Sequence, residues 1–255
     1  MIRAAFFDID GTLLSFVTHR VSPGTIEAFE SLKKKGILTF ICSGRAKVLV
    51  PTMPLHFDGV ITVNGGYCQA GDKVIYRNPL NHDDAQTWMD YADRHNYVSM
   101  AFTEYEMFTN HIDELARQLR DQLEFEMPKL RPNRELVGKD IYQFIAMIPE
   151  SKDAEVLELL PHCRLPRWHP AFSDLVPSDS SKAVGMEKIL THFGIHRDEC
   201  IAFGDGANDI EMLEYAGIGV AMGNASDRVK AHADHVTTDV DSEGILNALQ
   251  SLQII

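Results

Sequence analysis

The sequence predicts an α/β protein with a Rossmann-like parallel-sheet core and a smaller α+β insertion. Short apolar segments alternate with amphipathic ones near both ends of the chain, as they do where helices join parallel strands. The middle of the chain differs, because a series of prolines divides it into short pieces. We therefore expect residues 1–82 and 179–255 to form the core and residues 83–178 to form the insertion.

The first core segment predicts three strands and one helix. The strands are expected in IRAAFF (2–7), ILTFIC (37–42) and VITV (60–63). The helix is expected in SPGTIEAFESLKKKG (22–36). Ser22 can cap its N-terminus, Pro23 suits the first helical position and Gly36 can end it.

The other segments complete the pattern. In the second core segment, SSKAVGMEKILTHFG (180–194) has helical spacing, and CIAF (200–203) and GIGVAM (217–222) read as strands. In the insertion we expect helices in DDAQTWMDYADRHN (83–96), ELARQLRDQLEFE (114–126) and DAEVLELLPH (153–162). A strand is expected in YQFIAMI (142–148).

Composition narrows the classes of function. The chain has 255 residues, 45% of them hydrophobic, which is enough to bury a sizeable core. Its 24 Lys and Arg against 37 Asp and Glu give a formal net charge of −13, which repels nucleic acid and anionic lipid. The apolar runs are too short to span a bilayer, and the four cysteines show no C-x-x-C spacing. We expect a reduced, cytoplasmic protein with neither nucleic acid nor membrane as partner.

Acidic residues follow the first predicted strand directly, in FFDIDGT (6–12). In an extended chain, residues i and i+2 point to the same side, about 7 Å apart, so Asp8 and Asp10 can face one small ion or substrate. An ordinary acidic turn has the same composition, and for a single D-x-D it is the commoner explanation.

Two other strand ends favour a site. ILTFIC runs directly into SGR (43–45), and CIAFG runs directly into DGAND (205–209). Open parallel sheets bind their ligands outside the carboxyl ends of the strands. We therefore expect these three segments, distant in sequence, to converge on one crevice.

The motifs resemble those of a known superfamily. DIDGT, SGR, the Lys182 that opens KAVGMEKIL, and GDGANDIEML occur in the order of the four motifs of the haloacid dehalogenase superfamily. The chain is most similar to its Cof-like sugar-phosphate phosphatases, which share NGG (64–66) and carry a cap inserted between the second and third motifs. Residues 83–178 match that cap in position and length.

This resemblance implies a Mg²⁺-dependent phosphatase that hydrolyses small phosphorylated metabolites, above all sugar phosphates, through an aspartyl-phosphate. Asp8 would be the nucleophile, and Asp10 would protonate the leaving alkoxide and then activate water. The metal would be held by Asp8, the backbone carbonyl of Asp10, Asp205 and Asp209, with Asp209 acting from behind the direct ligands. The phosphate would be bound by Ser43, Gly44, Lys182 and Asn208.

Several of these residues also have ordinary explanations. Lys182 could be a solvated lysine at a helix start, although a cation there opposes the helix dipole. Arg45 could contact phosphate or pair with nearby acids. Gly11 suits a close backbone approach with an unusual φ, and the Thr12 hydroxyl is expected to hold the loop.

The insertion also offers candidates. PRWHPAFSD (166–174) brings together Arg167, His169 and Asp174, which could select a sugar, and Trp168 and Phe172, which could equally be core residues of the cap. The histidines show no zinc-binding spacing.

Two rival functions stay open at the level of sequence. A phosphomutase would use the same Asp8 chemistry and return the phosphoryl group to the sugar. A non-catalytic phosphosugar-binding regulator would use the same fold, but the presence of both Asp8 and Asp10 argues against it.

Overall fold

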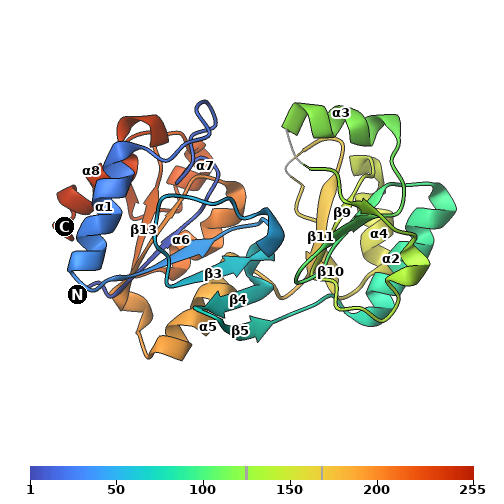
Figure 1. The fold of residues 1–255 in the computed structure, drawn as a ribbon, viewed down its shortest axis with the longest axis horizontal. Coiled ribbons are helices and arrows are strands. Elements are labelled where there is room, and N and C mark those ends of the chain that lie inside the picture. Colours follow the sequence, from blue (N-terminus) through green and yellow to red (C-terminus); the bar gives the residue numbers. More distant parts are fainter. Residues whose placement is uncertain (124–125, 168) are drawn as a thin grey trace. The chain divides into compact units, whose positions relative to one another are not determined.

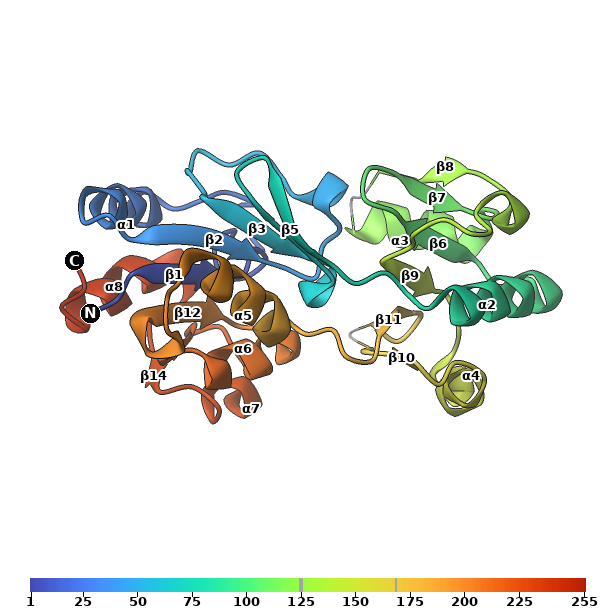
Figure 2. The same ribbon diagram turned by 90° about the horizontal axis from the view of Figure 1, so that it is seen from below.

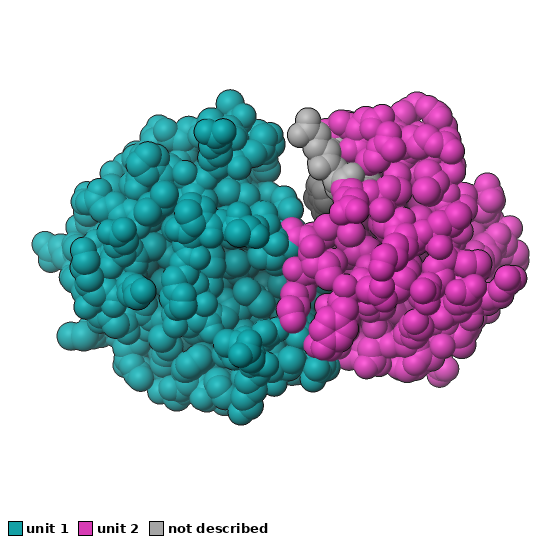
Figure 3. Space-filling model, viewed as in Figure 1, with its two compact units in different colours: residues 1–45, 50–77, 181–255 teal, residues 46–49, 78–180 magenta. Residues whose placement is uncertain are grey.

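The computed structural model describes residues 1–123, 126–167 and 169–255. It divides into two compact units, which Figure 3 shows in different colours. Unit 1 comprises residues 1–45, 50–77 and 181–255, and unit 2 comprises residues 46–49 and 78–180. The insertion predicted from sequence, residues 83–178, falls within unit 2.

Unit 1, all of whose residues are described, is built on an eight-stranded sheet in the order β14-β13-β12-β1-β2-β3-β4-β5 (Figure 1). The first six strands in this order pair in parallel, and β4 and β5 add an antiparallel edge. The strands are β1 (Ala4–Phe7), β2 (Leu38–Cys42), β3 (Gly59–Thr62), β4 (Tyr67–Ala70), β5 (Lys73–Arg77), β12 (Cys200–Gly204), β13 (Ile218–Ala221) and β14 (His235–Val236).

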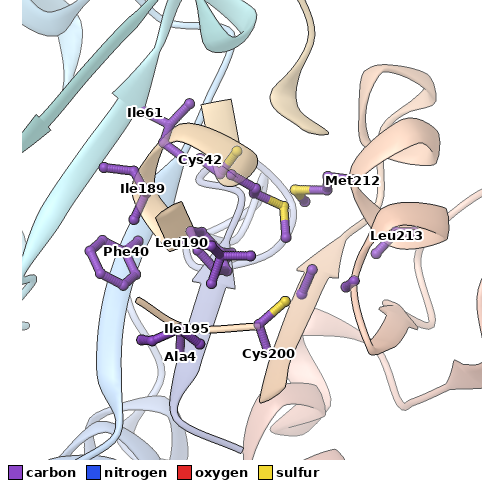
Figure 4. Close-up of a cluster of buried hydrophobic side chains, with 14 of the residues drawn as sticks. Ala4, Phe40, Cys42, Ile61, Ile189, Leu190, Ile195, Cys200, Met212 and Leu213 are labelled. Atoms are coloured by element: carbon purple, nitrogen blue, oxygen red, sulfur yellow. The ribbon is translucent and has the colours of Figure 1, made fainter. Parts of the chain in front are cut away.

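Helices cover both faces of this sheet. They are α1 (Pro23–Lys34), α5 (Lys182–Phe193), α6 (Ile210–Tyr215), α7 (Asp227–Lys230) and α8 (Gly244–Ser251). Side chains alternate along β1, so Phe7 packs in the cluster that contains α1 and α8, and Phe6 packs in the cluster that contains α5 and α6. Figure 4 shows the second cluster, where Ile189 and Leu190 of α5 lie with Phe40 of β2. Both faces of the parallel strands are therefore buried.

The helices that frame the sheet begin where local chemistry favours a start. The Ser22 side chain accepts a hydrogen bond from the Thr25 N–H, and Pro23 occupies the first turn of α1. Ser181 caps α5 in the same way by accepting from the Val184 N–H. Lys182 is thereby fixed as the first residue of α5, at the point where the chain enters the last part of the core.

Among its described residues, unit 2 forms a six-stranded sheet in the order β10-β11-β9-β6-β7-β8 (Figure 2). Helices α2 and α4 pack on one face of it, where Trp88 and Val156 share a buried cluster with Phe144. The elements are α2 (His82–His95), β6 (Ser99–Phe102), β7 (Met107–Thr109), α3 (Glu114–Leu123), β8 (Lys129–Leu130), β9 (Gln143–Ala146), α4 (Asp153–Leu159), β10 (Cys163–Arg164) and β11 (Ser173–Pro177).

The α/β architecture predicted from sequence is confirmed, although it contains elements that were not predicted, including five of the six strands of unit 2 and β14, α7 and α8 of unit 1. Strands β4 and β5 were not predicted, and they make one edge of the core sheet antiparallel. The helix expected over residues 114–126 is α3, whose predicted end includes residues 124–125, outside the described residues. Of the helices in the described part of the chain, none is long and apolar enough to cross a membrane.

Candidate active site

Five adjacent parallel strands of unit 1 deliver polar residues to the same edge of the sheet. Strand β1 is followed by Asp8, β2 by Ser43 and β12 by Asp205. Strand β3 leads to Asn64, and β13 leads through a short turn to Asn224. Because the strands are parallel, their carboxyl ends lie together, and the three segments singled out in the sequence do meet here.

Lys182 joins two of these loops through its ammonium group. Its Nζ donates to Asp8 Oδ1 at 2.6 Å and to Asp209 Oδ1 at 2.5 Å. The lysine is 1% exposed and Asp209 is fully buried. The alternative of a solvated lysine at a helix start is therefore wrong. The positive charge of Lys182 pairs with buried carboxylates instead.

Asp209 organises the loop that carries Asp205. Its Oδ2 accepts the backbone N–H groups of Asp205 at 3.0 Å and Gly206 at 2.8 Å. A side chain on Gly204 would lie 2.5 Å from Asp209 Cβ, so only glycine allows this approach. With Lys182 on its other oxygen, both carboxylate oxygens of Asp209 are hydrogen-bonded within the site, and its supporting position behind the direct ligands stays a prediction.

Asp205 is held by donors from two other strand ends. Thr12 Oγ1 donates to its Oδ1 at 2.9 Å, and Asn224 Nδ2 donates to its Oδ2 at 3.2 Å. The same Asn224 amide donates to the carbonyl oxygen of Gly11 at 2.8 Å. Gly11 has φ +79°, and a Cβ there would lie 2.2 Å from Asp205 Oδ2. The expected roles of Gly11 in a close approach and of Thr12 in fixing the loop are confirmed.

The cluster of Asp8, Asp205, Asp209 and Lys182 carries more acids than cations. Burial raises the pKa of Asp8 to about 8; Lys182 opposes this rise, and the neighbouring carboxylates of Asp209 and Asp205 add to it. Burial and the neighbouring Asp209 raise the pKa of Asp205 to about 7. Burial by itself would lower the pKa of Lys182, but the Asp209 and Asp8 carboxylates outweigh it and hold that pKa above its ordinary range. The site is therefore short of positive charge.

This charge balance and the donor chemistry suit a small divalent cation. Among the described residues, one group of three carboxylates has ligand oxygens within 4.8 Å of one another, and it consists of Asp8, Asp205 and Asp209. Hard carboxylate oxygens are the donors that Mg²⁺ and related ions prefer. A bound cation would also offset the energetic cost of burying the negative charges of Asp8 and Asp205. The residues therefore fit a metal site.

Asp10 lies beside the cluster and pairs with Arg45. The guanidinium of Arg45 donates a hydrogen bond to each carboxylate oxygen of Asp10, from Nε to Oδ2 and from Nη2 to Oδ1, each at 2.8 Å. Both side chains are more than one third exposed, so the pair is open to solvent. Of the two readings of Arg45, the structure shows the ion pair with a nearby acid.

The loops after β2 and β12 meet at Gly44. Ser43 is 1% exposed, and its Oγ accepts the Arg45 N–H at 3.2 Å. A Cβ on Gly44 would lie 3.1 Å from Asn64 Oδ1 and 3.4 Å from Asn208 Nδ2, so this stretch of backbone lies against both amides. Asn208 donates to Asn64 Oδ1 at 3.1 Å. The residues expected to bind phosphate are thus gathered in unit 1 with the acidic cluster.

The three residues expected to select the substrate lie in unit 2. Arg167 donates to Asp153 in a two-pronged pair, with Nε to Oδ2 at 2.9 Å and Nη2 to Oδ1 at 2.5 Å, and also to backbone carbonyls, including that of Ile148. It thus ties the start of α4 to the β9 side of this unit. Its selection of a sugar stays a prediction.

The neighbours of Arg167 are placed differently. The His169 ring stacks on Phe172 with ring centres 4.9 Å apart, and Asp174 is a buried residue of β11. Phe172 is itself buried, as expected for a core residue of this unit. Trp168 lies outside the described residues.

Sequence reasoning missed two residues of this site. Asn224 was not considered, although the segment GVAMGN places it just beyond a strand end on the same edge. Asn64 was noted within NGG and given no role. Both could have been found by searching for polar residues just beyond the carboxyl end of each of the five strands, since ligands bind there in open parallel sheets.

Comparisons with known proteins agree with this geometry. A family model described as haloacid dehalogenase-like hydrolase matches residues 5–249. A Bacillus subtilis protein named as a phosphatase, YkrA, is 31% identical over 99% of this chain and 98% of its own length. A Streptococcus pyogenes protein named as a bifunctional phosphatase and peptidyl-prolyl cis-trans isomerase is 34% identical over 100% of this chain. The chain spans 54% of that relative's length.

A solved structure gives the same picture in three dimensions. A protein described as a sugar phosphatase of subclass IIB is 37% identical, with a TM-score of 0.90. The match covers 99% of this chain and 100% of that one. The likeness therefore extends over both units.

Proposed function

This chain belongs to the haloacid dehalogenase-like hydrolases and is a phosphatase, and on that premise we propose that it hydrolyses sugar phosphates with Mg²⁺ through an aspartyl-phosphate on Asp8. The observation that carries the proposal is the placement of Asp8. Its carboxylate stands at the end of the central strand β1, and Lys182 holds it at 2.6 Å from Nζ to Oδ1. An oriented carboxylate is what attack on phosphorus requires.

The first step is the transfer of the phosphoryl group. A carboxylate oxygen of Asp8 forms a bond to phosphorus while the bond from phosphorus to the ester oxygen breaks. The Lys182 ammonium and the N–H groups of the Ser43–Gly44 loop stabilise the negative charge that spreads over the transferring oxygens. Asp209 holds the Lys182 ammonium from the other side.

Asp10 is the proposed acid and base. Its protonated carboxyl gives the proton to the leaving alkoxide, and its carboxylate then takes a proton from the water that attacks the aspartyl-phosphate. Water attack releases phosphate and restores Asp8. The Arg45 pair orients Asp10, and because both side chains are partly exposed, the carboxylate can exchange this partner for substrate or water.

The metal would be held by Asp8, Asp205 and the backbone carbonyl of Asp10, with Asp209 supporting Asp205. When bound, Mg²⁺ supplies positive charge that attracts the phosphate oxygens. The protein as a whole, with a net charge of −13, would repel them. Hydrogen bonds from Thr12 and Asn224 would keep the Asp205 carboxylate oriented for this role. The high pKa values of Asp8 and Asp205 support the need for such a cation.

The substrate class rests on the sugar phosphatase among the similar structures. We propose that residues 1–82 and 179–255 are the catalytic core and that residues 83–178 are a cap that selects small phosphorylated metabolites in the cytoplasm. Arg167, His169 and Asp174 remain the candidates for that selection.

A screen of phosphorylated metabolites tests the proposal. Purified protein with Mg²⁺ should release inorganic phosphate from hexose or pentose phosphates, and an Asp8→Asn variant should release none. Analysis of the organic product separates hydrolysis from isomerisation, since a mutase would yield an isomerised ester. Absence of phosphate release from every sugar phosphate would overturn the proposed substrate class.

A further inference from the structure

The loop after β3 has an unusual backbone. Val63, Asn64 and Gly65 have φ of 47°, 52° and 92°, three left-handed residues in succession. Asparagine and glycine tolerate this region, but a β-branched residue such as Val63 rarely adopts it. Strain of this kind persists where the surroundings impose it, and it concentrates at functional sites.

Contacts from two neighbouring loops impose this conformation. The Asn64 N–H donates to the carbonyl oxygen of Ser43 at 3.1 Å, and the Val63 N–H donates to that of Arg45 at 2.9 Å. On the other side, a Cβ on Gly65 would lie 1.9 Å from the carbonyl oxygen of Ser181. The loop is therefore wedged between the Ser43–Arg45 loop and the residue that precedes Lys182.

The result is a buried carboxamide beside Gly44. Asn64 is 4% exposed, and its Oδ1 accepts from Asn208. Both carboxamide atoms would lie close to a Cβ on Gly44, Oδ1 at 3.1 Å and Nδ2 at 3.2 Å. Among the residues that the structure describes, Asn64 Nδ2 has no hydrogen-bond partner, although its N–H groups are strong donors.

We propose that Asn64 Nδ2 donates a hydrogen bond to an oxygen of the bound phosphate group, next to Ser43 and Gly44. This inference rests on the proposed function, because it places phosphate at the Ser43–Gly44 loop. A neutral amide donor suits the position, since it contributes a donor without adding a charge that would pair with Asp8 or Asp205. The ligand would accept from the Asn64 amide nitrogen, while Asn64 Oδ1 accepts from Asn208.

The left-handed backbone allows clean variants. Asn64→Gly removes the carboxamide and keeps a residue that favours positive φ, and Asn64→Asp keeps an acceptor for Asn208 but loses the donor. Asn96 provides a matched control, because it has the same conformation with φ 56° and ψ 39° at the end of α2 in unit 2. Asn96→Gly should therefore report any effect of the backbone change alone.

The experiment measures the binding of inorganic phosphate in the presence of Mg²⁺, as the inhibition constant and as the rise in Tm. For Asn64→Gly and Asn64→Asp we expect binding weaker by about tenfold or more, as for loss of a hydrogen bond to a charged group. Asn96→Gly should bind as the wild type does. Tm without phosphate shows whether each variant is folded.

A double-mutant cycle separates this role from mere support of Asn208. If Asn64 binds phosphate itself, Asn64→Gly should weaken binding further in an Asn208→Ala background. If the effect of Asn64→Gly vanishes in that background, or if neither Asn64 variant changes phosphate binding, the inference is overturned. A wild type that binds no phosphate and cleaves no ester would overturn the proposed function as well, so the two failures are distinguishable.

Discussion

The Nζ of Lys182 lies 2.6 Å from Oδ1 of Asp8, and the side chains of both residues are at most 10% exposed. This contact matters because an isolated buried charge is costly, and the Lys182 ammonium partly compensates the charges of Asp8 and Asp209. The contact links the first strand of the chain to a helix that begins 174 residues later. It therefore connects the N-terminal and C-terminal sequence segments that make up the core.

Removal of Lys182 should damage both stability and activity. Lys182→Met leaves Asp8 and Asp209 without their cation, and we expect a loss of about 3 kcal/mol in the free energy of unfolding in metal-free buffer. Turnover should fall about 100-fold or more, as for loss of a charge that stabilises the transition state. Urea denaturation and steady-state kinetics measure the two effects.

The control lies on the same helix. Lys188 of α5 is partly exposed and pairs with Glu187, so Lys188→Met should change stability by less than about 1 kcal/mol. Equal losses for the two variants would contradict the role assigned to Lys182.

The raised pKa values predict how stability depends on pH without metal. Asp8 and Asp205, with pKa values of about 8 and about 7, keep protons in the folded state that the unfolded chain has already lost above pH 4 or so. Since the folded state binds more protons, the free energy of unfolding should fall as pH rises toward 8. Mg²⁺ should reverse this trend, because it binds the deprotonated carboxylates.

Thermal unfolding between pH 5.5 and 8.5, in EDTA and in Mg²⁺, measures this dependence. Asp8→Asn should flatten the decline in EDTA, and comparison with the wild type removes the contribution of histidines. If stability in EDTA rises over this range, with the same slope in wild type and variant, then the pKa values of these acids are not raised in the folded state.

Asp10 should matter to catalysis and little to folding. Asp10→Asn removes a proton donor and acceptor, and we expect turnover to fall about 100-fold to 10,000-fold. Its pair with Arg45 is partly exposed, so the free energy of unfolding should change by less than about 1 kcal/mol. Kinetics and denaturation on the same preparation test this, and a variant with near wild-type turnover would exclude Asp10 as acid and base.

The candidates in unit 2 should separate into two kinds. Asp174→Asn and His169→Ala should lower kcat/KM for the preferred sugar phosphate and leave a small aryl phosphate nearly unaffected, because selection uses contacts remote from phosphorus. Arg167→Ala should change selection in the same way and should also lower Tm, since it breaks the pair with Asp153. If the two substrates change in parallel for every variant, these residues do not select the sugar.

Much of the core could be read from the sequence because its signals are local. Ser22 and Pro23 mark the start of α1 within two residues, and acids at strand ends mark the site. Strands β4 and β5 were missed although QAGDK contains a turn signal, because these short strands are only partly buried and show weak alternation.

Other features depend on contacts that no local pattern records. The pair of Arg167 with Asp153 joins residues 14 positions apart, so the sequence suggested Arg167 as a candidate for sugar selection and did not indicate this partner. The left-handed Val63 and the partners of Asn64 arise from packing against two other loops. Ion pairs and loop conformations of this kind depend on tertiary contacts, and the local conformational propensity of the residues does not predict them.

Identification of the residue that becomes phosphorylated is the most direct test of Asp8 as the nucleophile. Wild-type protein is mixed with a ³²P-labelled sugar phosphate and Mg²⁺, quenched in acid within the first turnover, digested and mapped by mass spectrometry. We expect label on Asp8 in the wild type and none in Asp8→Asn. Label on a serine or a histidine would contradict this role of Asp8.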